Sequence, residues 1–317
     1  MSAQWNVGRA AVLGAGTMGS RIAAHLANCG IPTWLLDLAP TELTPEEQKK
    51  GLTLASPLVR SRVARLGLDA AQKGKPAAFF TDEMATRITV GNFEDHLDWV
   101  GRADWIIEAV AENLEIKRTL WRRVAAVRRP GTVASTNTSG LSIAGIAEGF
   151  PEEFRRNFLG AHFFNPPRYL HLVEIIPGPD TLPEVTEAVS RFADLRLGKG
   201  VVRAKDTPNF IANRIGTFCI CHAFRVLREE GLAVEEVDRL LSAVVGWPRS
   251  ALFGTLDLVG LDILANVART LFDQAPRDES RDLFRLPDFA EKMLARGLLG
   301  NKTGSGFYRR PAKSSNG

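Results

Sequence analysis

The chain has 317 residues, of which 45% are hydrophobic and 24% charged, and its 40 Lys and Arg outnumber its 36 Asp and Glu to give a formal charge of +4. A chain of this length can form two domains with separate cores, and its composition is that of an ordinary globular protein. The small positive charge does not indicate a nucleic-acid partner, and no apolar run approaches the length of a membrane span.

The N-terminal residues and the cysteines indicate the compartment. The first residues show no signal-peptide pattern, so we expect a cytoplasmic protein. The three cysteines, Cys29, Cys219 and Cys221, cannot form a disulfide framework. His222 follows two of them, but no second ligand pair accompanies this group, and we expect no metal site. Buried apolar thiols are the expected role of all three cysteines.

A glycine-rich turn near the start of the chain is the strongest local signal. An apolar run over residues 10–13 leads into this turn, an amphipathic helix is expected at about residues 18–28, and a second apolar run ends in Asp37. A dinucleotide site needs this order, because glycines let a pyrophosphate approach the backbone and the helix N-terminus offers unpaired N–H groups. We expect the pyrophosphate to contact the residues of the turn, Gly14, Ala15, Gly16, Thr17, Met18 and Gly19.

Asp37 lies about twenty residues beyond the first glycines, where a carboxylate can accept hydrogen bonds from an adenosine ribose. The alternative to a nucleotide site is that the glycine turn in residues 10–37 serves only the packing of the helix on the sheet. The complete order of strand, turn, helix, strand and terminal acid favours the nucleotide site.

Residues 44–75 form a polar, helix-prone segment that is longer than an ordinary crossover. We expect a helical hairpin that projects from the sheet. Its basic residues would ordinarily belong to a solvated surface. These residues are Arg60, Arg62, Arg65, Lys73 and Lys75.

The chain then alternates between strands and helices. Strands are expected at residues 87–90, 103–110 and within 131–140, and a helix at about 114–127. Such alternation predicts a mostly parallel sheet. The next two strands, within residues 160–167 and 171–176, are joined by a connection too short for a helical crossover, which makes them antiparallel neighbours. A helix near 183–195 and a strand at 201–204 complete this domain.

From Thr207 onward every periodic segment is helical. Thr207 and Pro208 have the residue types of a helix N-cap and first helical position. Further helices are expected at residues 234–245 and 256–272. We therefore expect an α/β domain over residues 1–204, a helical domain over 205–310 and a flexible tail at 311–317.

Several motifs in this order resemble those of the L-3-hydroxyacyl-CoA dehydrogenases of fatty-acid β-oxidation. The resemblance covers nearly the whole chain and rests on residues 14–19, 107–117, 137–139, 162–166, 205–214 and 302–308, together with Glu174. It implies a Rossmann-type doubly wound sheet with an all-helical C-terminal domain, NAD as the cofactor and a CoA thioester as the substrate. The chain looks most like the dehydrogenase portion of larger multifunctional members, and it could be a piece of a longer enzyme.

The family's reaction removes a hydride from C3 of the acyl chain and a proton from its hydroxyl group. His162 lies where the family has its catalytic base, and histidine is the side chain suited to proton exchange near neutral pH. Glu174 lies inside the apolar run 172–176, where a carboxylate needs a partner because burying it unpaired is costly. The resemblance implies that Glu174 holds the other nitrogen of the imidazole ring.

The resemblance implies roles for further polar residues. Ser139 and Asn213 would belong to the catalytic and substrate-binding set, and Ser139 would also contact the cofactor. The remaining cofactor-side positions are Asn165 near the nicotinamide, Glu112, Lys117 (also near the thioester end of CoA) and Lys302. Glu112 and Lys117 could instead form a surface helix pair, and Lys302 could be a cap. The other histidines, His25, His96, His171 and His222, are expected to be structural.

The chain also departs from the family pattern. Gly140 stands where many members have a second serine, and residues 248–253 replace a Gly-Pro turn of the short enzymes. Because residues 248–253 depart from the family pattern, the resemblance does not predict the acyl-chain length preference or the dimer geometry. The basic residues of the hairpin are a candidate site for the 3′-phosphate ADP of CoA.

The resemblance therefore predicts an NAD-dependent 3-hydroxyacyl-CoA dehydrogenase of fatty-acid β-oxidation, with a homodimer formed through the helical domain. Two alternatives stay open. One is a dehydrogenase of a free hydroxy acid or sugar acid on the same scaffold. The other is a non-catalytic relative, which the intact His162/Glu174 and Ser139/Asn213 pairs argue against.

Overall fold

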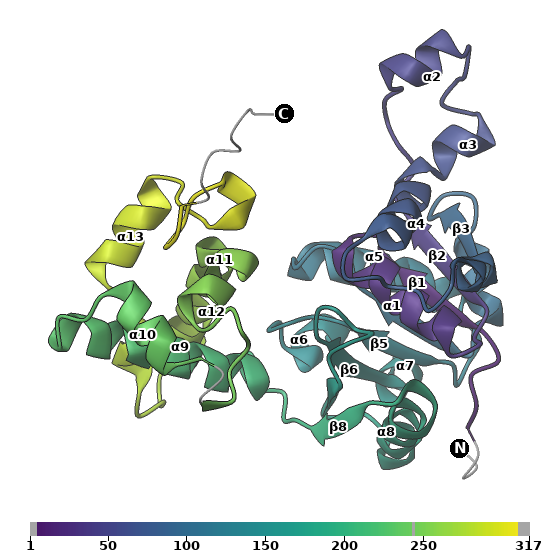
Figure 1. The fold of residues 1–317 in the computed structure, drawn as a ribbon. Coiled ribbons are helices and arrows are strands. Elements are labelled where there is room, and N and C mark those ends of the chain that lie inside the picture. Colours follow the sequence, from purple (N-terminus) through teal and green to yellow (C-terminus); the bar gives the residue numbers. More distant parts are fainter. Residues whose placement is uncertain (1–4, 243–244, 310–317) are drawn as a thin grey trace. The chain divides into compact units, whose positions relative to one another are not determined.

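The computed structural model describes residues 5–242 and 245–309, and the chain divides into two units between Thr207 and Pro208. Unit 1 is the sheet-containing part and unit 2 the helical part (Figure 1). The expected tail at 311–317 and residues 243–244 of the expected helix at 234–245 lie outside the described residues. No helix in the described part of the chain is long and apolar enough to cross a membrane.

A single sheet organises unit 1. Within the described residues it has eight strands in the order β3-β2-β1-β4-β5-β6-β7-β8, and every pair is parallel except β6 and β7 (Figure 1). The strands are β1 (Ala10–Leu13), β2 (Thr33–Asp37), β3 (Ile88–Asn92), β4 (Trp105–Glu108), β5 (Val133–Thr136), β6 (Phe158–Phe163), β7 (Leu172–Pro177) and β8 (Gly200–Arg203). The chain runs outward from β1 to β3 and then returns to β4 on the other side of β1. This reversal confirms the predicted doubly wound sheet.

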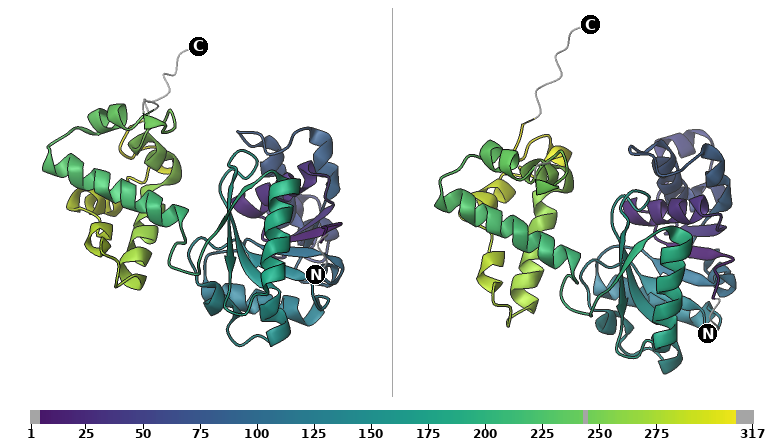
Figure 2. Two further views of the ribbon diagram at one scale, coloured as in Figure 1. Left: turned by 90° about the horizontal axis from the view of Figure 1, so that it is seen from below. Right: turned by 60° about the horizontal axis from the view of Figure 1, so that its bottom comes forward.

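Helices cover both faces of the sheet. Those of unit 1 are α1 (Thr17–Asn28), α2 (Pro45–Lys49), α3 (Pro57–Arg60), α4 (Arg62–Lys73), α5 (Leu114–Val127), α6 (Ile143–Ala147), α7 (Glu152–Arg156) and α8 (Pro183–Leu197). Buried residues of α1, α4 and α8 share one core cluster with the sheet. In Figure 2, α8 lies along the sheet in both views. On the other face the ring of Trp121 in α5 packs edge-on against Phe158 of β6 and Phe154 of α7. Because both faces are covered, β1 consists of four fully buried apolar residues.

Residues 44–75 form three helices. Ala64, Leu68 and Ala71 of α4 are buried, so α4 packs with α1 onto the sheet. Figure 1 shows α2 and α3 beyond α4, away from the sheet. Thr44 caps α2, because its hydroxyl accepts from the N–H of Glu47 and its own N–H donates to the Glu47 carboxylate.

Unit 2 is helical, as predicted. Its described α-helices are α9 (Ala212–Glu229), α10 (Val234–Leu240), α11 (Phe253–Val259), α12 (Leu261–Gln274) and α13 (Asp288–Ala295). Short 3₁₀ helices in the two units are η1 (Asp82–Arg87), η2 (Leu97–Arg102), η4 (Arg281–Phe284) and η5 (Asn301–Thr303). The rings of Phe224, Phe253 and Phe307 pack together in the core of this unit.

Three helix predictions in unit 2 are wrong in their bounds. The helix expected over 234–245 ends at Leu240. The helix expected to begin at Pro208 begins at Ala212, because Asn209 and Phe210 have φ angles of 60° and 53°, which a right-handed helix does not accept. The helix expected over 256–272 is two helices, since Gly260 has a φ of 111° and separates α11 from α12.

The three cysteines are free thiols in different surroundings. Cys221 is buried, and burial raises the pKa of its thiol to about 12. Cys29 is half-buried and Cys219 is exposed. The expectation of three buried thiols is therefore wrong for Cys219, whose position on α9 faces solvent.

His25 is a buried histidine of α1. Its Nε2 bonds the carbonyl of Leu197 at 3.0 Å, so it is the donor and the ring is neutral with Nε2 protonated. Burial, with a smaller contribution from the charge of Lys199, lowers the pKa of His25 from 6.5 to about 4. The unfolded chain, with the ordinary pKa, therefore binds a proton that the folded chain excludes. Stability is lost as the pH falls from 6.5 towards 4.

We predict that the titration of His25 alone lowers the free energy of unfolding by about 2 kcal/mol when the pH falls from 7 to 5. His25→Gln retains a donor for Leu197 but does not titrate, so its stability should fall less over the same range. Urea unfolding followed by tryptophan fluorescence at the two pH values measures the difference. An equal fall in both proteins would show that the pKa of His25 does not differ between the folded and the unfolded chain.

Candidate active site

The polar residues of interest in unit 1 gather at one edge of the sheet. β1, β4, β5 and β6 are parallel, so their carboxyl ends lie along the same edge. Gly14 follows β1, Glu108 and Thr136 end β4 and β5, and His162 is next to last in β6. Ligands of doubly wound sheets bind at this edge, beside the point where the strand order reverses.

The glycine turn has the geometry of a phosphate site. Gly14 has a φ of 101°, and a Cβ there would lie 2.6 Å from the carbonyl oxygen of Ala109. A Cβ on Gly19 would lie 1.8 Å from the carbonyl oxygen of Gly14, so both positions exclude a side chain. At Gly16 a Cβ would meet nothing within 4 Å, and no side chain caps α1. The first N–H groups of α1 are thus placed as an anion site requires.

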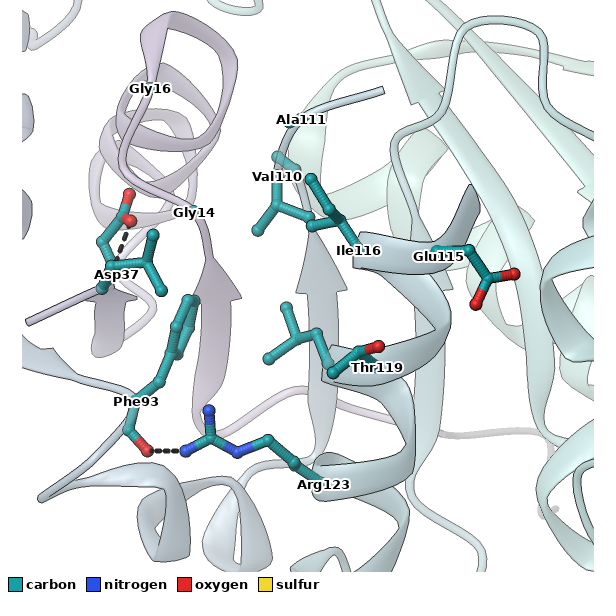
Figure 3. Close-up of a pocket in the computed structure, with 13 residues that line it drawn as sticks. Gly14, Gly16, Asp37, Phe93, Val110, Ala111, Glu115, Ile116, Thr119 and Arg123 are labelled. Carbon is teal, nitrogen blue, oxygen red and sulfur yellow. Dashed lines mark hydrogen bonds between the residues drawn. The ribbon is translucent and has the colours of Figure 1, made fainter. Parts of the chain in front are cut away.

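Asp37 closes this turn from the end of β2. Its Oδ2 accepts from the N–H of Ala15 at 2.5 Å and its Oδ1 from the N–H of Leu38 at 2.7 Å. Asp37, Gly14 and Gly16 line a pocket of about 630 Å³, which continues between the end of β4 and α5 (Figure 3). An open phosphate turn, an acidic residue and an adjoining apolar pocket fit the adenosine diphosphate half of NAD.

Other walls of this pocket were not predicted from the sequence. Phe93 follows β3, and Ile116 and Thr119 lie on α5 (Figure 3). Arg123 of α5 also lines the pocket and donates to the carbonyl of Phe93 at 2.7 Å. These residues line the pocket only because α5 packs beside β3 and β4, and the sequence has no local signal for that packing.

His162 and Glu174 form a buried pair. They are directly opposite each other in the antiparallel register of β6 and β7, and Nδ1 of His162 lies 2.7 Å from Oε2 of Glu174. Glu174 is 0% exposed and His162 is 4% exposed. The carboxylate accepts the proton on Nδ1, so Nε2 is the ring nitrogen that would exchange a proton with a substrate.

The turn that carries Ser139 lies beside this pair in the fold. Asn137 joins β5 to β6, since its Oδ1 accepts from the N–H of Phe163, the neighbour of His162, at 2.8 Å. Glu112 holds the turn itself, because its Oε1 accepts from the N–H of Ser139 at 2.8 Å and from that of Gly140 at 3.2 Å. Lys117 lies 3.3 Å from the other oxygen of Glu112.

Asn165 lies in the exposed connection between β6 and β7. Its Oδ1 accepts from Nη1 of Arg21 in α1 at 2.8 Å. Lys199 donates to the carbonyls of Pro167 and, at 2.9 Å, of Leu170 in the same connection. The connection is therefore tied both to α1 and to the start of β8.

The remaining predicted residues belong to unit 2 and to residues 44–75. Asn213 belongs to the first turn of α9 in unit 2. Lys302, in η5 of unit 2, forms an ion pair with Asp262. Two of the basic hairpin residues also have acidic partners, Asp95 for Arg60 and Glu47 for Arg62.

Glu108 is the main polar residue of this edge that sequence reasoning missed. It ends the apolar strand β4 and is 0% exposed, with its carboxylate bonded to Lys117 and Thr136. A carboxylate inside an apolar run was the signal that identified Glu174, and the same signal was present at Glu108. In the described part of the chain, no group of three or more His, Cys, Asp or Glu residues could hold a metal ion.

Comparison with known families agrees with this arrangement. Residues 9–207 match the family model "3-hydroxyacyl-CoA dehydrogenase, NAD binding domain", and residues 210–310 match "3-hydroxyacyl-CoA dehydrogenase, C-terminal domain". The first match supports NAD as the cofactor.

Curated relatives and solved structures are also similar. A probable 3-hydroxyacyl-CoA dehydrogenase of Bacillus subtilis is 49% identical over 98% of this chain, which spans only 39% of that protein. One of Deinococcus radiodurans is 44% identical over 95% of this chain and 82% of its own length. The crystal structure of (S)-3-hydroxybutyryl-CoA dehydrogenase PaaH1 from Ralstonia eutropha has a TM-score of 0.76 at 27% identity, covering 97% of this chain and 100% of that one.

We predict that NADH is preferred over NADPH because of Asp37. A 2′-phosphate on the adenosine ribose would approach this carboxylate, and two unit charges about 5 Å apart repel by about 3 kcal/mol at an effective dielectric constant near 20, which is a factor of about 100. Asp37→Asn keeps an oxygen that accepts from the N–H of Ala15 but removes the charge. It should therefore narrow the preference for NADH over NADPH. The measurement is kcat/KM with each cofactor.

Glu115→Gln is a matched control, because Glu115 lines the same pocket from α5. It should leave the preference unchanged. Equal efficiency with the two cofactors in the unmutated protein would contradict the role of Asp37.

Proposed function

Because this chain belongs to the 3-hydroxyacyl-CoA dehydrogenase family, we propose that it catalyses the reversible, NAD-dependent oxidation of L-3-hydroxyacyl-CoA to 3-ketoacyl-CoA. The observation that supports this most directly is the buried pair of His162 and Glu174 at the ligand-binding edge of the sheet. A histidine held in this way can accept the proton of a substrate hydroxyl group near neutral pH.

The two residues have complementary parts in the proposed reaction. Nε2 of His162 accepts the proton of the C3 hydroxyl group during oxidation and returns it during reduction. Glu174, bonded to Nδ1, fixes the orientation and tautomer of the ring and stabilises the imidazolium that forms. NAD, when bound, supplies the acceptor for the hydride that leaves C3.

We assign the binding residues on the family resemblance and their positions. Gly14 to Gly19 and Asp37 would hold the adenosine and pyrophosphate, as the open turn and the pocket support. The cofactor contacts that rest on the resemblance are Glu112, Lys117, Ser139, Asn165 and Lys302, and the substrate contacts are Ser139, Lys117 and Asn213.

The substrate proposal is a CoA thioester of fatty-acid β-oxidation. The similar protein of Ralstonia eutropha is named as a 3-hydroxybutyryl-CoA dehydrogenase, which supports a short acyl chain as the first substrate to try. The free thiols Cys29, Cys219 and Cys221 fit a reducing compartment such as the cytoplasm. A homodimer through the helical unit is also proposed on the resemblance.

The proposal predicts that NADH oxidation with acetoacetyl-CoA is more efficient than with free acetoacetate by about 100-fold or more, because binding energy from the remote CoA supports the reaction at C3. The measurement is kcat/KM for both compounds, followed by a graded series of 3-ketoacyl-CoA esters. Free acetoacetate used as efficiently as its CoA ester would favour the alternative, a dehydrogenase of free hydroxy acids. No turnover of any 3-ketoacyl-CoA by the folded chain would contradict the proposed function.

A further inference from the structure

Gly67 lies in the middle of α4, with its backbone against the glycine turn that follows β1. A Cβ at this position would lie 2.1 Å from the carbonyl oxygen of Ala15, where ordinary contact begins at 3.4 Å. It would also lie 2.9 Å from the Cβ of Ala15. Neither neighbour is the end of a flexible side chain that could move aside. Only glycine therefore fits this position without a shift of α4 or of the turn.

The packing of α4 explains why a glycine is kept inside this helix. Glycine in the middle of a helix lowers its stability relative to alanine. The buried residues Ala64, Leu68 and Ala71 fix α4 in the core cluster that α1 and the sheet share. They hold the helix so close to the turn that no side chain fits at residue 67. The stability lost at Gly67 is thus the consequence of this close approach.

The contact sets the direction of the Ala15 carbonyl group. A Cβ on Gly67 would lie 2.1 Å from the carbonyl oxygen but 3.0 Å from the carbonyl carbon, so the C=O bond points towards α4. The peptide bond to Gly16 is trans, since the cis bonds of the described residues precede Pro76 and Pro166. The C=O and N–H groups of a trans peptide point in opposite directions. The N–H of Gly16 therefore points away from α4.

This N–H group is available to a ligand at the phosphate turn. Within residues 5–242 and 245–309 the N–H of Gly16 donates to no group. Gly16 is the N-cap of α1, and a Cβ there would meet nothing within 4 Å, so the space beside it is open. The N–H of Ala15 is already used, because it donates to Asp37. Of these two neighbouring donors, an anion can therefore bind the one on Gly16.

We propose that Gly67 is a positioning residue for the pyrophosphate of NAD. Its Cα holds the peptide between Ala15 and Gly16 with the N–H of Gly16 directed into the phosphate site, and Gly67 itself does not contact the cofactor. α4 is then a wall of the cofactor site as well as the support of α2 and α3. The inference concerns cofactor binding alone and does not depend on the acyl substrate.

The test is the binding of three nucleotides to Gly67→Ala in the full chain. The added Cβ displaces the Ala15 carbonyl and so turns the N–H of Gly16 away from the phosphates. We expect the Kd for NADH and the Kd for ADP-ribose to rise about 10- to 100-fold, as for the loss of one hydrogen bond to a charged group. The Kd for adenosine, which has no phosphate, should change by less than about threefold. Calorimetry and displacement of NADH measure these values.

Two variants are matched controls. Ala71→Gly weakens the packing of the same helix without adding an atom beside the turn. Gly216→Ala makes the same change as the test variant within α9, where the new Cβ would meet nothing within 4 Å. The first should lower stability and the second should raise it slightly. Both should leave the three Kd values within about threefold of those of the unmutated chain.

A double variant provides the same test if Gly67→Ala does not fold. In Gly67→Ala/Ala15→Gly, the glycine at residue 15 removes one of the two conflicting atoms and lets the peptide turn its oxygen aside. The reference is Ala15→Gly alone, in which the backbone contact with Gly67 is kept. The Kd for NADH should be about tenfold higher in the double variant than in this reference.

Three results would overturn the inference. One is a folded Gly67→Ala protein, or double variant, that binds NADH as tightly as its reference. Another is an equal rise of the Kd for NADH and for adenosine, and the third is an equal rise for NADH in Ala71→Gly. Either rise would assign the effect to loosened packing of α4 and not to the direction of one N–H group.

Discussion

The antiparallel pairing of β6 with β7 is the constraint on which the site depends. Residues 164–171 are too short to form a crossover, so the chain must turn back beside β6. In the resulting register His162 is directly opposite Glu174, and cross-strand neighbours of this kind share one face of the sheet. A slip of one residue would turn Glu174 to the other face, away from its partner. Because an unpaired buried carboxylate is costly, the contact between His162 and Glu174 and the register stabilise each other.

The parallel part of the sheet supplies the second constraint. Its strands all end at one edge, so the phosphate turn after β1, Glu108 of β4 and Thr136 of β5 are brought together without long connections. Hydrogen bonds then join neighbouring strand ends in sequence, from Glu108 to Thr136 and from Asn137 to Phe163. These hydrogen bonds fix the positions of neighbouring strand ends relative to each other.

Much of this arrangement could be predicted from the sequence. The residue order around Gly14 and Asp37 predicted the first strand, turn and helix, because turn chemistry and periodicity are local properties. Glu174 was identified as a buried residue because a charge within an apolar run needs a partner. The burial of Lys117 was not predictable in this way, since lysine on an amphipathic helix usually faces solvent, and only the packing of α5 on β4 encloses it. The late start of α9 also depends on tertiary contacts. The side-chain amide of Asn209 donates to the carbonyl of Val267 and helps to hold a backbone conformation that propensity does not favour.

The most direct test of proton transfer by His162 is single-residue replacement with cofactor binding measured in parallel. His162→Asn removes the proton acceptor but keeps a side-chain amide that can donate to Glu174, so the buried carboxylate retains a partner. We predict that kcat falls by about 10²- to 10⁴-fold and that the Kd for NADH stays within about threefold, because the nucleotide is held at the glycine turn and Asp37. A folded His162→Asn protein with nearly full kcat would contradict the assignment of His162 as the catalytic base.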